Sequence, residues 1–199
     1  MTAEKVPCIA DFGPYTVLDL HDLPEDGKGF ELEDGWLIEV AAGYRHNWIA
    51  RRLARIVEAA GDGLVVALDG GEWEVSTPSG VRKPDVVVVS TDLAHALLAE
   101  EMPKLIPGTE LLLAVEVVSP GSASERTDRV RKVHEYAALG IPQYWLVEQR
   151  PDVRVHRFVL DGSSYKCEPI VAAGSEFRAD VKADTVFPVT FDPAELLGH

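Results

Sequence analysis

One stretch of the sequence, residues 111–118 (LLLAVEVV), limits most strongly what this chain can fold into. It has the length of a strand, and a run that is apolar on both faces predicts a strand buried on both sides. Glu116 lies inside this run. A carboxylate at such a position costs free energy unless a metal ion, a cation or several hydrogen bonds compensate its charge. The run therefore predicts a buried strand and a site of chemistry around Glu116.

The residues that follow this run predict a strand–helix–strand unit. Residues 119–121 read Ser-Pro-Gly, which stops the strand, and residues 123–139 show helical spacing that ends at Gly140. A second apolar run, over residues 143–147, has the length of another strand. We therefore expect the rest of the chain to be organised around this unit.

Hydrophobic periodicity and turn residues predict the remaining elements. The expected helices are 16–23, 44–60 and 91–101, and the expected strands are 30–32, 36–40, 64–68, 72–75, 85–89, 153–160, 164–171 and 185–191. Residues 77–84 are expected to form a loop, and Asp-Gly pairs at 34–35 and 161–162 predict hairpin turns. This order favours one α/β or α+β domain over residues 16–199, with a mixed sheet, an N-terminal hairpin and a β-rich tail. Residues 1–15 are expected to be irregular.

Composition is that of an ordinary globular protein, with 46% hydrophobic and 26% charged residues. No apolar run is long enough to span a membrane, and no secretory signal is recognisable, so a cytoplasmic location with Cys8 and Cys167 reduced is expected. The net charge of −14 argues against broad, sequence-independent attraction to nucleic acid. A local basic cleft remains compatible with it, because Lys and Arg cluster at 51–55, 82–83 and 126–132.

Two acids stand at the ends of apolar runs. Asp85 opens the run 86–89, and Glu116 comes late in the run 111–118. If these strands are neighbours, both carboxylates can reach one ion, and together with a main-chain carbonyl and water they suit Mg²⁺ or Mn²⁺. The alternative is that Asp85 is a turn acid and that Glu116 pairs with an arginine.

Lys132, Glu31 and His46 are further candidates. Lys132 lies one helical turn from Asp128, so it either reaches the end of the Glu116 strand from the edge of the buried face or pairs with Asp128 on a solvated surface. Glu31 alternates with apolar residues in the first hairpin, and this pattern favours an outward, exposed position. His46, near the start of a helix, is more typical of a cap or a packing residue than of a catalyst. The charges at Glu125, Arg126, Arg129 and Arg131 are expected to be solvated.

Several motifs in a fixed order resemble the Uma2 family, formerly a domain of unknown function. They are FELEDG at 30–35, His46 on a helix, KPD at 83–85, VEVVSP at 115–120, and Lys132 followed by EYAALGIPQYWLV at 135–147. Members of this family are similar to the PD-(D/E)XK restriction-endonuclease-like fold. The resemblance therefore implies a central mixed sheet flanked by helices, from about residue 16 to about residue 190.

The resemblance also implies roles for individual residues. Asp85 and Glu116 would be metal ligands, and Glu31 would be an additional acid. The usual pattern places a lysine two residues after the second acid, where this chain has Val118. The resemblance implies that the lysine has moved to the following helix, at Lys132. Val117, in the buried strand, is expected to supply a carbonyl ligand.

The function expected from these residues is Mg²⁺- or Mn²⁺-dependent hydrolysis of DNA phosphodiester bonds by an endonuclease. A homodimer is expected, because cutting two strands often needs two sites, and no membrane partner is expected. One alternative is a catalytically silent module with the same fold that binds nucleic acid or protein. Another is a metal-dependent hydrolase of a smaller phosphodiester.

Overall fold

The structure is a computed structural model that describes residues 13–40, 42–99, 105–118, 121 and 125–198. Its helices are α1 (Val17–His21), α2 (Tyr44–Gly61), α3 (Thr91–Leu98) and α4 (Lys132–Ala138), with a π-helical turn η3 (Thr127–Arg131) and 3-10 turns η1 (Pro24–Gly27), η2 (Gly108–Glu110) and η4 (Pro193–Leu197). Its strands are β1 (Phe30–Glu33), β2 (Trp36–Glu39), β3 (Val65–Asp69), β4 (Val75–Thr77), β5 (Gly80–Arg82), β6 (Val86–Ser90), β7 (Ile106–Pro107), β8 (Leu113–Val118), β9 (Gln143–Glu148), β10 (Arg154–Asp161), β11 (Ser164–Cys167), β12 (Val171–Ala172), β13 (Phe177–Lys182) and β14 (Val186–Phe191).

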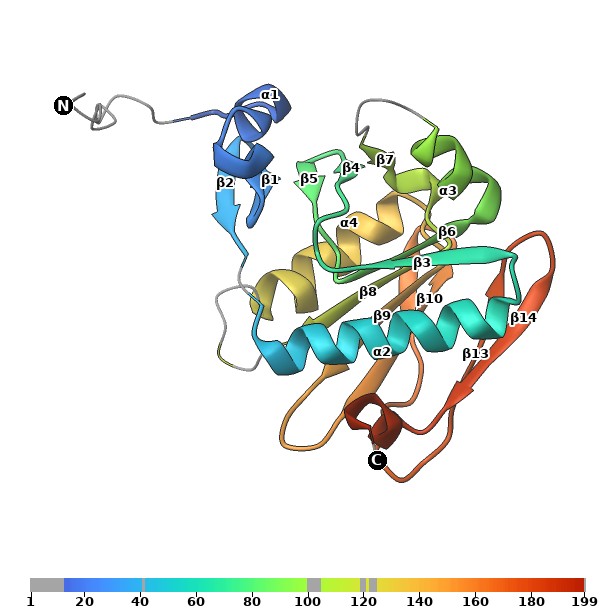
Figure 1. The fold of residues 1–199 in the computed structure, drawn as a ribbon. Helices are drawn as coiled ribbons and strands as arrows, with labels where there is room; N and C mark the ends of the chain where they lie inside the picture. Colours follow the sequence, from blue (N-terminus) through green and yellow to red (C-terminus); the bar gives the residue numbers. More distant parts are fainter. Residues whose placement is uncertain (1–12, 41, 100–104, 119–120, 122–124, 199) are drawn as a thin grey trace.

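A seven-stranded mixed sheet forms the centre of the fold, in the order β11-β10-β9-β8-β6-β3 with β12 beside β10. Strand β8 pairs parallel to β9 and antiparallel to β6, and every residue of β8 is buried. Alternate residues of β8 face two different apolar clusters: Val115 packs with residues of α2, and Ala114 packs with Tyr136 of α4. The two helices therefore cover opposite faces, as Figure 1 shows, and the predicted strand buried on both sides is confirmed.

A smaller five-stranded sheet, in the order β2-β1-β5-β4-β7, lies beside α4 (Figure 1). The hairpin predicted around Asp34-Gly35 is confirmed as β1 and β2. The prediction of a loop over residues 77–84 was wrong, because β4 and β5 form a second hairpin there. Gly80 allows it: its φ is 141°, and a Cβ at this position would lie 2.5 Å from the carbonyl oxygen of Leu32 in the neighbouring strand.

The C-terminal part is rich in strands, as expected. The hairpin at Asp161-Gly162 is confirmed as β10 and β11, although β11 ends at Cys167 and not at residue 171. The strand expected over residues 185–191 is β14, and its antiparallel partner β13 was not predicted. In β13 Phe177, Ala179 and Val181 are buried and their neighbours are exposed, so strict alternation was the signal that could have identified it.

Other predicted boundaries are close to the observed ones, with shifts of a few residues. The strand expected at 72–75 is β4 (Val75–Thr77), and the helix expected at 91–101 ends at Leu98, with residues 100–104 outside the described part of the chain. The helix expected at 123–139 is described from Glu125 and contains the π-helical turn. Ser119, Cys8 and most of the segment 1–15 also lie outside the described residues. Among the described helices, none combines the length and the apolar character that a membrane span requires.

Candidate active site

Asp85 and Glu116 lie across from each other at one end of the central sheet. The antiparallel register of β6 and β8 pairs Val86 with Val115 and Val87 with Ala114. Continued by one position, the same register puts Asp85 opposite Glu116. Directly opposite residues of an antiparallel pair point to the same face, with Cβ atoms about 5 Å apart. The fold thus brings together the two carboxylates that the sequence predicted as a pair.

Both carboxylate oxygens of Asp85 are held by neighbouring groups. Nε2 of His46, near the start of α2, lies 2.7 Å from Oδ1, and the main-chain N–H of Val117 donates a hydrogen bond of 2.6 Å to Oδ2. Both side chains are largely buried: that of Asp85 is 14% exposed and that of His46 is 10% exposed. Nδ1 of His46 is buried and has no hydrogen-bond partner among the described residues. His46 therefore fixes the orientation of Asp85 from α2, a role that the expected cap or packing function did not include.

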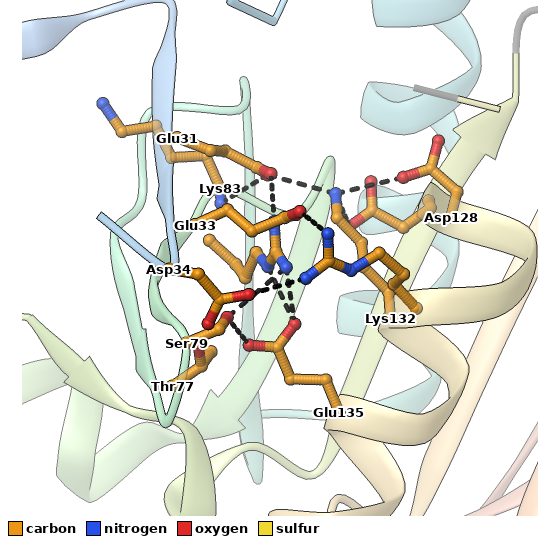
Figure 2. A network of polar contacts seen from close by, with 12 residues as sticks. Glu31, Glu33, Asp34, Thr77, Ser79, Lys83, Asp128, Lys132 and Glu135 are labelled. Carbon is orange, nitrogen blue, oxygen red and sulfur yellow. Dashed lines mark hydrogen bonds and ion pairs between the residues drawn. The ribbon is translucent and has the colours of Figure 1, made fainter. Parts of the chain in front are cut away.

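Lys132 is buried among carboxylates from three different elements. Its Nζ lies 2.9 Å from Oε1 of Glu116 on β8. It also lies 3.1 Å from Oε1 of Glu31 on β1 and 3.1 Å from Oδ1 of Asp128 on the preceding turn (Figure 2). The contact with Asp128 is close enough for an ion pair but lacks hydrogen-bond geometry, since Oδ1 has no hydrogen-bond partner. The i,i+4 pair considered from the sequence does form, but the expectation that it lies on a solvated surface was wrong.

Charge in this cluster is not balanced by Lys132 alone. Burial raises the pKa of Glu116 well above its ordinary value. Lys132 acts to lower this pKa, but the neighbouring acids Asp128 and Asp85 raise it further. Burial likewise raises the pKa of Asp128. Burial by itself would lower the pKa of Lys132, but Glu116, Glu31 and Asp128 outweigh it and raise that pKa well above the usual range. The lysine is therefore kept charged, while two of its acids retain a tendency to hold a proton.

Glu31 behaves differently from the other two acids. Although burial acts to raise its pKa, Lys132 and Arg82 together lower the pKa of Glu31 below its ordinary value. Its Oε1 also accepts a hydrogen bond of 2.9 Å from the main-chain N–H of Lys83. Glu31 is 2% exposed, so the interpretation that alternation places it outward was wrong: Arg82, Lys83 and Lys132 contact its carboxylate.

A buried arginine connects Glu31 to the rest of the small sheet. Arg82 on β5 is fully buried and bonds three acids: Nη1 lies 2.5 Å from Glu33 and 3.2 Å from Glu31, and Nε donates a hydrogen bond of 2.9 Å to Glu135 of α4. Figure 2 shows Glu31, Glu33 and Glu135 gathered between strand β1 and helix α4. Arg131 adds ion pairs with Glu33 and Asp34, and its side chain stays 50% exposed, as the expectation of a solvated charge required.

Tyr136 completes the surroundings of Glu116. Its hydroxyl donates a hydrogen bond of 3.0 Å to Oε1 of Glu116, and burial raises its pKa well above the ordinary value. Oε2 of Glu116 makes no hydrogen bond with any described residue. Sequence reasoning did not select Asp128, Tyr136 or Arg82 for the site. The spacing of Asp128, Lys132 and Tyr136, each one helical turn apart, was the signal available for the first two.

The donor atoms present suit a small divalent cation. Asp85 and Glu116 offer hard carboxylate oxygens on one face, and Oε2 of Glu116 has no hydrogen-bond partner among the described residues. Among the described residues, no group of three or more His, Cys, Asp or Glu side chains is arranged to hold a metal ion. Two carboxylates with main-chain and water oxygens remain a suitable set for Mg²⁺.

Comparisons with known proteins agree with this architecture. A family model named Uma2 and described as "Putative restriction endonuclease" matches residues 17–189. A crystal structure of a "putative nuclease belonging to DUF820" from Anabaena variabilis is similar in fold, with a TM-score of 0.64 and 15% sequence identity over 93% of this chain and 98% of that chain. No curated protein matches the sequence.

Proposed function

The chain belongs to the Uma2 family, and on this basis we propose that it is a metal-dependent endonuclease that hydrolyses phosphodiester bonds of DNA. The observation that carries the proposal is the position of Lys132, which is buried between Glu31 and Glu116 next to the Asp85–Glu116 pair. Two carboxylates at the ends of neighbouring strands, with a lysine beside them on a helix, form the set of groups that phosphodiester hydrolysis with a metal ion requires.

Asp85, Glu116 and the main-chain carbonyl of Val117 would hold Mg²⁺ or Mn²⁺. When bound, the metal would lower the pKa of a coordinated water and stabilise negative charge on the phosphate. Asp85 is oriented for this by His46 and by the N–H of Val117. Glu116 is oriented by the hydroxyl of Tyr136, which donates to Oε1 and leaves Oε2 without a partner among the described residues.

Lys132 would orient the attacking water and stabilise charge that develops on the phosphate. Its ammonium group is held from three sides, so little reorganisation is needed when charge develops. Glu31 acts on Lys132 and not on the metal in this arrangement, because its two oxygens bond Lys132, Lys83 and Arg82. Glu31, the additional acid of the site, would therefore hold Lys132 in place.

The test is to incubate the protein with supercoiled plasmid, single-stranded DNA and RNA, with Mg²⁺ or Mn²⁺ and with EDTA. Metal-dependent cleavage of DNA that is lost in Asp85→Ala and Lys132→Ala would support the proposal. Undiminished cleavage in these variants would contradict the assigned site. Lys166→Ala is a suitable control, because Lys166 is exposed on β11 and has no ion pair with any described residue.

Absence of cleavage on every substrate would contradict the nuclease proposal and favour a silent binding module with this fold. Preferential cleavage of RNA or of a small phosphodiester would instead change the substrate class. We further propose that the protein acts in the cytoplasm as a homodimer, since cutting both strands of a duplex needs two sites. Sedimentation with and without DNA tests the oligomeric state.

A further inference from the structure

Helix α2 carries aromatic and basic side chains on its solvent-exposed face. Tyr44, Asn47, Trp48, Arg51 and Arg55 are all exposed, and their spacing of three or four residues places them on one face of the helix. We call this set the α2 stripe. At 1.5 Å per residue, it extends over about 16 Å. The opposite face of α2 packs on the central sheet, so packing in the core explains none of these five side chains.

The two aromatic rings of the α2 stripe already lie against each other. The ring centroids of Tyr44 and Trp48 are 6.3 Å apart with planes inclined by 27°, and the two residues are 83% and 42% exposed. Beside them is a hollow of about 320 Å³ lined by Tyr44, Arg45, Trp48 and Leu197. Large exposed aromatic side chains gathered at a hollow mark a binding surface, and flat π-faces suit the stacking of flat ligands.

Basic side chains extend this aromatic surface. Arg51 and Arg55 form no hydrogen bond or ion pair with any described residue, unlike Arg82, Arg129 and Arg131 elsewhere in the chain. The whole helix contains four arginines and one acid, Glu58, in a chain of net charge −14. The α2 stripe is therefore a local region of positive charge on an acidic protein, and its charges are free to bind an anion.

The α2 stripe begins next to the proposed active site. His46 lies between Tyr44 and Trp48 in the sequence, and its Nε2 is 2.7 Å from Oδ1 of Asp85. The same helical turn thus presents its buried side to the metal-ligating acid and its exposed side to solvent. A polymer bound along the α2 stripe would therefore pass within one helical turn of His46, which contacts the carboxylate of Asp85.

We propose that the α2 stripe binds an unpaired segment of the DNA substrate, with bases stacked on Tyr44 and Trp48 and phosphates at Arg51 and Arg55. This inference rests on the proposed function and adds to it the conformation of the substrate. Proteins that bind single strands combine these two features, an aromatic surface for the bases and a positive surface for the backbone. Paired bases within a duplex expose only their edges, so the aromatic pair distinguishes an unpaired strand from a duplex.

Binding is measured in EDTA by fluorescence anisotropy of a labelled oligo(dT), an RNA oligonucleotide and a DNA duplex. We expect the wild type to bind the single DNA strand more tightly than the duplex. Trp48→Ala and Tyr44→Ala should each weaken binding about tenfold, whereas Trp36→Ala, at an exposed tryptophan on β2, should leave it unchanged. Arg51→Glu with Arg55→Glu should weaken binding and flatten its salt dependence, and Arg178→Glu on β13 is the matched control.

Wild-type affinity in all variants of the α2 stripe would overturn the inference, as would equal or tighter binding of the duplex, tighter binding of the RNA, or no binding of any strand. Failure of the nuclease proposal gives a different result, because binding in EDTA needs no cleavage. Stripe-dependent binding without cleavage in Mg²⁺ would reject the nuclease and retain the strand-binding surface. Cleavage that is unaffected by Trp48→Ala at limiting substrate would retain the nuclease and reject the surface.

Discussion

Nζ of Lys132 lies 2.9 Å from Oε1 of Glu116, and both side chains are almost completely buried. Glu116 is on the strand β8, and Lys132 is the first residue of α4, which follows the π-helical turn η3. The resemblance to restriction-endonuclease-like proteins implies a lysine two residues after Glu116 on the same strand. Here Val118 occupies that place, and the helix delivers the ammonium group to the same carboxylate.

Replacing Lys132 by Met should abolish cleavage and also destabilise the protein. The variant leaves Glu31, Glu116 and Asp128 without their shared cation, and breaking a buried ion pair typically costs about 3–5 kcal/mol. Urea unfolding measures the loss, with Lys166→Met as the control that should change stability by less than about 0.5 kcal/mol. An unchanged free energy of unfolding would mean that the cluster contributes no net stability.

Replacing Arg82 by Met should weaken the contact between the β1–β2 hairpin and α4. Arg82 is fully buried and bonds Glu31, Glu33 and Glu135, so its loss should cost about 3–5 kcal/mol and lower cleavage by displacing Glu31 and hence Lys132. Arg82→Lys should rescue only a part of this, because an ammonium group cannot replace the planar fork of the guanidinium. Full activity and stability in Arg82→Lys would contradict the proposed link.

Stability without metal should depend on pH through Glu116. Its pKa is raised in the folded state above the ordinary 4.5, so its contribution to stability is complete at pH values below 4.5 and is lost as the pH rises through the folded-state pKa. Denaturant unfolding in EDTA should therefore show a smaller decline of stability with increasing pH in Glu116→Gln than in the wild type. Identical pH profiles for the two proteins would show that Glu116 is not the group responsible.

His46 should affect the metal requirement more than the maximal rate. Nε2 of His46 orients Asp85, and residues that orient a metal ligand typically change metal affinity 10- to 100-fold. We expect His46→Asn to need about that much more Mg²⁺ for half-maximal cleavage and to recover activity when Mg²⁺ is raised. Mg²⁺-dependent stabilisation against thermal unfolding provides a readout without cleavage. His95→Asn, at an exposed position on α3, is the control, and a lowered maximal rate at saturating Mg²⁺ would contradict a positioning role.

The elements that could be predicted from the sequence share one property: their periodicity is strong over several residues. The buried strand β8, the amphipathic helix α2 and the hairpin around Asp34-Gly35 were all identified in this way. The β4–β5 hairpin was missed because its strands are three residues long and Gly80 reads as a loop residue. Here the close approach to Leu32 requires a glycine inside the sheet.

Local sequence thus determined where an acid had to be compensated, because an apolar run around Glu116 leaves no other environment for it. Which groups compensate it was decided by the tertiary structure. Glu31 and Lys132 are 101 residues apart, and alternation in a four-residue strand does not say which face another element will cover. Docking of α4 against the hairpin and the end of β8 turns an apparent surface lysine and an apparent surface acid into a buried pair. That step depends on packing between distant segments, which residue spacing along the chain does not encode.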